Sequence, residues 1–180
     1  MWKGSVTIQS FHEHDADLNR IGKLFCRTFT GDHYSDSELE DAVSNITKHA
    51  GYEGFKGLKA KNQDDRLIGF AYGYFSLPHQ FYRKRLELQL TPEQTAKWLS
   101  DCFEFVEMAV NPGYRRRRVG GHLHDKLLEN SPQKTSVLTT SVDNFPAIQL
   151  YKQKGWEVVK ADAAVISESQ LQVIMGKGLS

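Results

Sequence analysis

The chain has 180 residues, of which 39% are apolar and 11% aromatic, and its formal net charge is +1. This length and apolar content predict one domain, spanning residues 1–180, with a sizeable core. A charge near zero argues against a protein that coats nucleic acid, because such proteins are strongly basic. No apolar run approaches the ~18 residues of a membrane helix, and the stretch MWKGSVTIQS lacks the apolar core of a signal peptide. We therefore expect a cytoplasmic protein with no membrane partner.

The residue types that bind metals are scattered. Cys26 and Cys102 stand far apart, which suits two buried thiols in a reducing compartment rather than a disulfide framework. His122 and His124 form an H-x-H pair without further ligands at metal spacing, so we interpret both as helix-surface residues. The sequence therefore predicts no metal site.

The first part of the chain predicts a strand followed by two helices. Alternating apolar residues mark a strand over residues 5–11, and apolar positions at helical spacing mark a helix over 18–29. Asp15 or Asp17 can cap that helix. A capping box predicts the start of a second helix, which runs toward Ala50. The candidate boxes are Ser35 with Glu38 and Ser37 with Glu40.

A hairpin and an insertion come next. Residues 53–76 are rich in aromatic and branched side chains and have a polar turn at Asn62–Asp65, which is typical of a β-hairpin. Residues 77–99 look like an insertion that carries one short helix. Thr91 is its expected N-cap and Pro92 its first residue.

The remaining elements alternate between strands and helices, which implies a mixed sheet with helices on its faces. The predicted strands are 102–110, 135–142, 156–161 and 171–177, and the predicted helices are 119–127 and 143–155.

The stretch NPGYRRRRVGGHL joins the strand 102–110 to the next helix and has the features of an anion site. The first N–H groups of a helix lack partners inside it, and the helix dipole is positive there. Glycine allows close approach of a phosphate, and Arg115–Arg118 adds donors that suit phosphate oxygens. A pyrophosphate is the expected ligand.

Two motifs in this order resemble the GNAT superfamily of acyl-CoA-dependent N-acetyltransferases. The first family signature, V-x-P-x-Y-R-x-x-G-I-G-x-x-L, is matched by Val110, Pro112, Tyr114, Arg115, Val119, Gly120 and Leu123. The second, N-x-x-A-x-x-L-Y-x-x-x-G-F, is matched by Asn144, Ala147, Leu150, Tyr151 and Gly155, with Trp156 in place of phenylalanine. One position departs from the family pattern, since Arg118 stands where the first motif has glycine. The resemblance is clear over residues 101–160.

The resemblance implies a three-layer fold with a mostly antiparallel sheet of about seven strands, two of which splay apart after Val110 to admit acetyl-CoA as co-substrate. It implies direct attack of a primary amine on the thioester, with Tyr151 as general acid and a backbone N–H near Val110 facing the oxyanion. The residues expected to contact CoA are Met108, Ala109, Val110, Arg115, Arg116, Arg117, Arg118, Val119, Gly120, Gly121, Asn144, Ala147 and Tyr151. Family members often dimerise, so a homodimer is a further expectation.

Two carboxylates on the strand 102–110 are candidates for the general base. A protonated amine must lose its proton before it attacks, and Glu104 and Glu107 stand three residues apart, hence on opposite faces of a regular strand. Glu107 is nearer the expected splay and is preferred, with Glu104 as second choice. The non-catalytic alternatives are that Glu107 is an ordinary solvated or salt-bridged carboxylate and that Tyr151 only packs in the core.

The acceptor is expected to be a small-molecule amine, although a protein amine stays open. Its expected contacts are Phe29, Asp32, His33, Tyr34, Tyr72, Tyr74 and Phe81. The alternative function is a non-catalytic module that binds nucleic acid or an acidic partner through Arg115–Arg118. The near-neutral net charge favours the enzyme and predicts no nucleic-acid partner.

Overall fold

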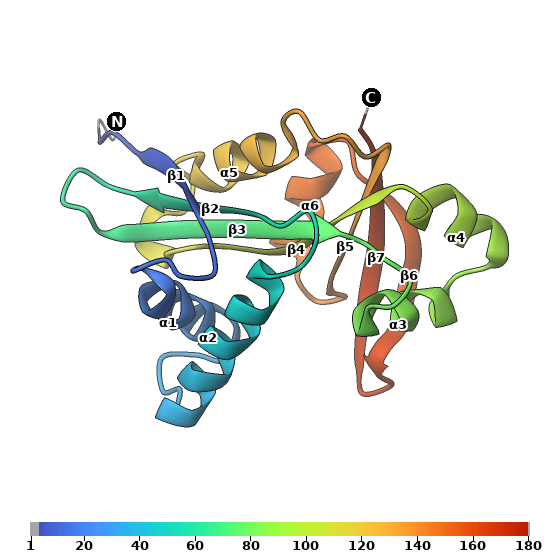
Figure 1. Ribbon diagram of the computed structural model, residues 1–180, viewed down its shortest axis with the longest axis horizontal. Helices are drawn as coiled ribbons and strands as arrows, with labels where there is room; N and C mark the ends of the chain where they lie inside the picture. Colours follow the sequence, from blue (N-terminus) through green and yellow to red (C-terminus); the bar gives the residue numbers. More distant parts are fainter. Residues whose placement is uncertain (1–3, 180) are drawn as a thin grey trace. The chain divides into compact units, whose positions relative to one another are not determined.

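A computed structural model describes residues 4–179 of the chain. The seven strands form one open, mostly antiparallel sheet in the order β1-β2-β3-β4-β5-β7-β6, with β4 and β5 parallel, and six α-helices accompany it (Figure 1). The predicted mixed α/β class is confirmed. The strands are β1 Thr7–Phe11, β2 Lys56–Lys61, β3 Leu67–Phe75, β4 Cys102–Val110, β5 Thr135–Ser141, β6 Glu157–Ser167 and β7 Gln170–Gly178. The helices are α1 Leu18–Phe29, α2 Asp36–Ala50, α3 Phe81–Gln89, α4 Pro92–Leu99, α5 Val119–Leu128 and α6 Phe145–Gln153, with a 3₁₀ turn η1 at Pro112–Tyr114.

Helix starts follow the predicted capping chemistry in two places and depart from it in a third. Ser35 Oγ accepts from the N–H of Glu38 at 3.1 Å, which settles the capping box of α2 in favour of this pair. Thr91 caps α4 with Pro92 in the first turn, as predicted. Asp17 precedes α1, but its side chain makes no capping bond. The prediction is wrong for the Asp17 side chain, because lysines on β2 bind its carboxylate instead. Asp15, the other candidate, accepts with its Oδ1 from the N–H of Asp17 at 2.8 Å, just before the helix.

The insertion was predicted to hold one helix and holds two. Before α4, residues 81–89 form α3, whose buried side chains are Arg83 and Leu86. Its sequence is strongly polar, so periodicity gives little helical signal. The helix forms because Leu86 enters a hydrophobic cluster with Trp98 and Leu99 of α4, a contact that sequence alone does not reveal.

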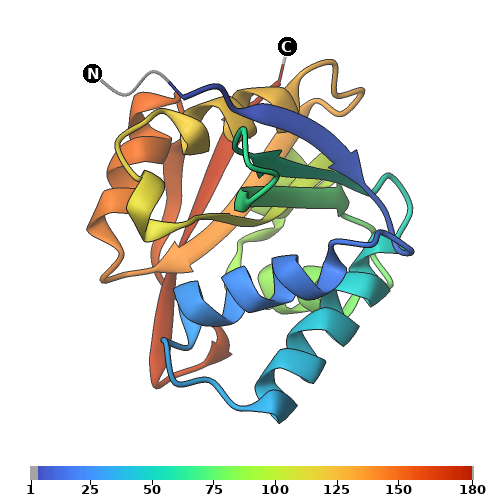
Figure 2. The ribbon, with the colours of Figure 1, turned by 90° about the vertical axis from the view of Figure 1, so that its left-hand side faces the viewer.

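The chain divides into two compact units. The first contains the described residues up to Tyr74 together with Glu107–Glu129. In this unit α1 and α2 lie on one side of β1–β3 and α5 lies on the other (Figures 1 and 2). Its buried side chains include Ile21, Ile46, Leu58, Ile68, Phe70, Leu123 and Leu127.

The second unit contains Phe75–Val106 and the described residues from Asn130 onward. Glu104 of β4 interacts electrostatically with Arg83 of α3, whereas the Phe105 ring contacts Tyr151 of α6 at 5.8 Å. Because neighbouring strand residues point to opposite faces, α3 and α6 cover opposite faces of this part of β4. Cys102 is buried here and Cys26 is buried in the first unit, which confirms the predicted buried thiols.

Side chains of the insertion form hydrogen bonds with the backbone of β6, the last strand in the sheet order. Arg85 Nε donates to the carbonyl of Val165 at 2.6 Å, and Gln89 Oε1 accepts from the N–H of Ala164 at 3.1 Å. An unpaired strand edge invites pairing with another chain. The α3–α4 insertion therefore protects part of this edge.

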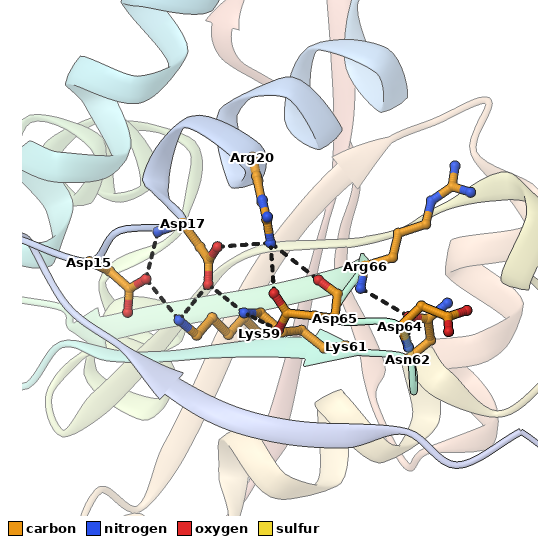
Figure 3. A network of polar contacts seen from close by, with 9 residues as sticks. All are labelled: Asp15, Asp17, Arg20, Lys59, Lys61, Asn62, Asp64, Asp65 and Arg66. Carbon is orange, nitrogen blue, oxygen red and sulfur yellow. Dashed lines mark hydrogen bonds and ion pairs between the residues drawn. The ribbon is translucent and has the colours of Figure 1, made fainter.

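A network of paired charges fixes the turn between β2 and β3 in the first unit (Figure 3). Asp17 accepts from Lys59 at 2.8 Å and pairs with Lys61 at 2.9 Å, while Lys61 also bonds Asp65 in the turn at 2.9 Å. Arg20 of α1 donates to the backbone carbonyl of Asp65 at 3.2 Å. Burial opposes ionisation of Asp17, but the hydrogen bonds from Lys59 and Lys61 outweigh it and lower the pKa of Asp17 to about 2.

This network predicts a pH-dependent loss of stability in Asp17→Asn. A lowered carboxyl pKa contributes stability above its unfolded value, near pH 4, and the contribution disappears as pH falls through the folded pKa of about 2. At pH 7 we expect a loss of about 2 kcal/mol in the free energy of unfolding. Urea denaturation from pH 7 to pH 3 measures it, and the gap should narrow toward pH 3.

Asp64→Asn is the matched control, since Asp64 is exposed in the same turn. It should change the unfolding free energy by less than about 0.5 kcal/mol. A pH-independent difference between wild type and Asp17→Asn would contradict the ionic account.

Candidate functional site: the loop before helix α5

The loop between η1 and α5 has an unusual backbone. Arg116 and Arg118 have φ angles of 61° and 63°, which lie in the left-handed region. A residue with a Cβ pays roughly 1–2 kcal/mol for this conformation, whereas glycine adopts it freely. The family pattern has glycine at the position of Arg118, and the left-handed backbone supplies the physical reason. The arginine keeps the glycine-like conformation at an energetic cost.

The loop leaves backbone donors available at the start of α5. The first helical bond runs from the N–H of His122 to the carbonyl of Arg118 at 3.0 Å. Within residues 4–179, the N–H groups of Arg116 and Arg118–Gly121 have no backbone acceptor. Five such donors beside a positive helix end have the charge and hydrogen-bonding capacity that an anion requires.

The four arginines differ in their surroundings. Arg115, Arg116 and Arg118 are exposed, while Arg117 is half-buried, with its guanidinium 5.1 Å from the centre of the Tyr114 ring. An arginine over an aromatic face gains a cation–π attraction. Three side chains are therefore free to meet a phosphate, and the fourth lies over Tyr114.

Gly120 sits where α5 meets β4. A Cβ at Gly120 would lie 3.6 Å from Val110 Cγ2 and 3.8 Å from Met108 Cε, which are ordinary contact distances. An alanine therefore fits in this ligand-free geometry, whereas a larger side chain would press on Val110 and Met108. Ala109, between them in sequence, is buried, as is Val119 at the start of α5.

Both candidate bases are perturbed by burial. Burial raises the pKa of Glu107 to about 8, although part of its side chain reaches the surface. Burial also raises the pKa of Glu104 to about 8, against the opposing charge of Arg83. Glu104 is 3% exposed, and its Oε2 has no hydrogen-bond partner within residues 4–179. A base is most effective when its pKa lies near the working pH, and Glu107 combines that property with access.

The second motif forms the start and core of α6. Asn144 caps the helix by accepting from the N–H of Ala147 at 3.4 Å, so its side-chain oxygen is used within the fold. Tyr151 is 7% exposed, and its ring contacts those of Phe105 and Trp156, each at 5.8 Å. The core-packing interpretation of the Tyr151 ring is thus correct, and it is compatible with chemistry at the hydroxyl.

The expected acceptor contacts fall into exposed and buried groups. Phe29 and Phe81 are 50% and 70% exposed. Asp32 and His33 are exposed as well, and Tyr34 is partly buried. These side chains are accessible to a ligand.

Tyr72 and Tyr74 are each only 2% exposed. Tyr72 Oη lies 2.9 Å from Nδ1 of His49, and the Tyr74 and His49 ring centres are 5.4 Å apart. Burial lowers the pKa of His49 to about 4, so the imidazole is neutral at pH 7. Both tyrosines belong to an aromatic core rather than to an open surface.

The two histidines of the H-x-H pair differ in their exposure to solvent. His122 is exposed, but His124 is 2% exposed and its Nδ1 lies 2.9 Å from Asp125. The surface interpretation is therefore wrong for His124, because the helix turns this position toward the core. In the described part of the chain no three His, Cys, Asp or Glu side chains gather as a metal site requires, and no helix is long and apolar enough to span a membrane.

The sequence did not predict that Asn62 forms a hydrogen bond with Tyr114, the residue directly before the arginines. Its Nδ2 donates to Tyr114 Oη at 2.9 Å, across 52 positions of sequence. The predicted turn at Asn62–Asp65 located the residue, but nothing in the sequence pairs it with Tyr114.

Several solved structures share the fold of this chain. Solved structures similar to this chain include PH1933 from Pyrococcus horikoshii OT3, at 17% identity and a TM-score of 0.71, covering 98% of this chain and 99% of that one. A phosphinothricin acetyltransferase from Sinorhizobium meliloti in complex with AcCoA is similar at 15% identity and a TM-score of 0.64, over 97% of this chain and 89% of that one. A spermidine N-acetyltransferase variant from Vibrio cholerae has 14% identity and a TM-score of 0.64, over 97% and 94%.

These likenesses establish a shared fold, while no curated protein sequence matches the chain. The family model described as the acetyltransferase (GNAT) family matches residues 18–156, and the chain therefore belongs to the GNAT acetyltransferases.

Proposed function

We propose that this protein is an N-acetyltransferase that moves an acetyl group from acetyl-CoA to the primary amine of a small molecule. The observation that carries the proposal is the set of unpaired N–H groups at Arg116 and Arg118–Gly121, at the start of α5. Five donors and three exposed arginines fit the pyrophosphate of CoA in charge and in hydrogen-bonding capacity.

Acetyl-CoA supplies the thioester carbonyl that the amine attacks. Glu107 takes the proton of the amine, either directly or through water, and its pKa of about 8 suits that transfer near neutral pH. A backbone N–H near Val110 would stabilise the oxyanion that forms on the thioester carbonyl. The Tyr151 hydroxyl then gives a proton to the departing thiolate. Glu107 and Tyr151 thereby act as base and acid in one turnover.

Several observations support a small-molecule acceptor. Spermidine and phosphinothricin, named for two of the similar structures, are small amines. In this chain, Phe29 at the end of α1 is exposed, and so are Asp32 and His33, which follow after two residues. The Asp32 carboxylate lies 3.9 Å from Arg27 Nε, so the exposed ring of Phe29 is what this segment offers to a cationic amine.

Binding of acetyl-CoA is the first test. A ligand at 100 times its dissociation constant stabilises a protein by ~2.7 kcal/mol, which is roughly 5–11 °C in melting temperature for a chain of this size. We expect a rise of this order with millimolar acetyl-CoA in a thermal unfolding assay. No shift in a folded sample, together with salt-dependent retention on DNA, would favour the nucleic-acid alternative.

The left-handed backbone of Arg118 predicts that Arg118→Gly makes the ligand-free protein more stable. Glycine removes the steric cost of φ 63°, so the unfolding free energy should rise by about 1 kcal/mol. CoA affinity should stay within about threefold, because one exposed charge contributes less than about 1 kcal/mol. Thermal unfolding and calorimetric titration measure the two effects.

Arg115→Gly is the matched control, since Arg115 has φ −65° and loses the same charge. Glycine only adds unfolded-state freedom there, so this variant should be less stable than wild type by about 0.5–1 kcal/mol. A tenfold or greater loss of CoA affinity in Arg118→Gly would instead make the Arg118 side chain a phosphate ligand.

The raised pKa of Glu107 predicts a pH signature. The wild-type rate should increase as pH rises through about 8, because the base must be ionised. Glu107→Gln should lower kcat by about 10²–10⁴-fold at neutral pH and partly recover near pH 10, where the amine loses its proton unaided. Free-thiol release with an acceptor found by screening amines gives both profiles.

Glu104→Gln serves as the comparison, because Glu104 has a similarly raised pKa on the same strand. It should lower kcat at every pH to the same extent, if at all. A recovering profile in Glu104→Gln and a flat one in Glu107→Gln would reverse the two assignments.

A further inference from the structure

Asn62 joins two parts of the first unit through both ends of its side-chain amide. Its Oδ1 accepts from the N–H of Asp64 at 3.0 Å and from the N–H of Arg66 at 2.9 Å. Two N–H donors identify this end of the amide as the oxygen. The nitrogen end is thereby directed at Tyr114 Oη, 2.9 Å away.

The turn that carries Asn62 is held from several directions. The Asn62 N–H donates to the carbonyl of Arg66, and the Asp65 N–H donates to the carbonyl of Asn62. Asp65 is in turn bonded by Lys61 and Arg20, as Figure 3 shows. Asn62 therefore offers Tyr114 a donor in a fixed position.

Tyr114 is the last residue of η1 and directly precedes the arginines. Its N–H donates to the carbonyl of Asn111 at 2.8 Å, and the Asn111 N–H donates to the carbonyl of Ile68 at 2.8 Å. The Tyr114 ring carries the guanidinium of Arg117. The orientation of this ring consequently influences the path of the loop on both sides of Arg116.

The loop needs such support. Left-handed backbone at Arg116 and Arg118 disfavours the observed conformation by roughly 1–2 kcal/mol at each position. A loop with ordinary φ angles at these two positions would direct its N–H groups differently. Contacts outside the loop must therefore offset the strain.

We propose that Asn62 is a positioning residue for CoA: through its hydrogen bond to Tyr114 it holds Arg115–Arg118 in the conformation that presents the N–H groups at the start of α5. This inference rests on the proposed function, because it concerns the phosphates of CoA. Neither Asn62 nor the Tyr114 hydroxyl takes part in the chemical step.

Tyr114→Phe is the first test, because it removes the hydroxyl and keeps the ring beneath Arg117. A single hydrogen bond corresponds to about a threefold to tenfold change in an equilibrium constant, so CoA should bind about threefold to tenfold more weakly by calorimetry. Pantetheine, which lacks the phosphates, is titrated in parallel by ligand-observed NMR. Its affinity should stay within about twofold of wild type. Gln63→Ala, a change at an exposed neighbour of Asn62, should alter neither affinity.

A double-mutant cycle with Asn62→Ala isolates the bond itself. Tyr114→Phe should weaken CoA binding in the wild-type background and have no further effect when Asn62 is alanine. Equal effects in both backgrounds, or equal losses for CoA and pantetheine, would overturn the proposal. If the wild-type protein binds no CoA at all, the proposed function fails and this inference fails with it. If CoA binds and Tyr114→Phe binds it equally well, only the positioning role is lost.

Discussion

The ion pairs of Lys59 and Lys61 are the interaction on which the position of the β2–β3 turn beside the candidate site depends. Lys59 and Asp17 are nearly enclosed, so each would be costly to bury alone, and together they stay charged. Their pairing joins the start of α1 to β2, and through Lys61 it fixes the turn of the hairpin (Figure 3). Asn62 stands in that turn and contacts the loop before α5. A charge network remote in sequence thus supports the turn that contacts Tyr114, directly before the arginine loop.

The loop before α5 combines a strained backbone with N–H groups that are available to a ligand. A glycine at position 118 would relax the backbone, but the arginine there adds a positive charge beside the helix end. The surrounding contacts at Asn62, Asn111 and Arg117 hold a conformation that the loop would disfavour alone. Preorganised N–H groups do not need to reorder when an anion binds, so little affinity is lost to reorganisation.

Strand β4 carries two carboxylates with similar pKa values and different surroundings. Glu104 is buried in the second unit with Arg83 nearby, and Glu107 is only partly buried in the first unit. Burial raises both pKa values, so the pKa alone does not distinguish a base from a structural residue. Access to a substrate does, and it favours Glu107. The partly buried half of β4, which contains Glu107, is accordingly where we propose the proton transfer.

The sequence by itself determined the order of the elements outside the insertion, the start of α2 near Ser35, the hairpin turn at Asn62 and the family, because each depends on residues close together in the chain. It did not reveal α3, whose helical state depends on burying Leu86 against α4. Nor did it reveal the burial of His124 and Tyr72, the role of Asp17 as an ion-pair partner, or the contact of Asn62 with Tyr114. Helices, turns and caps depend on hydrogen bonds between residues close in sequence, so they leave a periodic or short-range pattern that can be recognised. Burial and long-range pairing arise only when distant segments come together, so these features were decided by the tertiary structure alone.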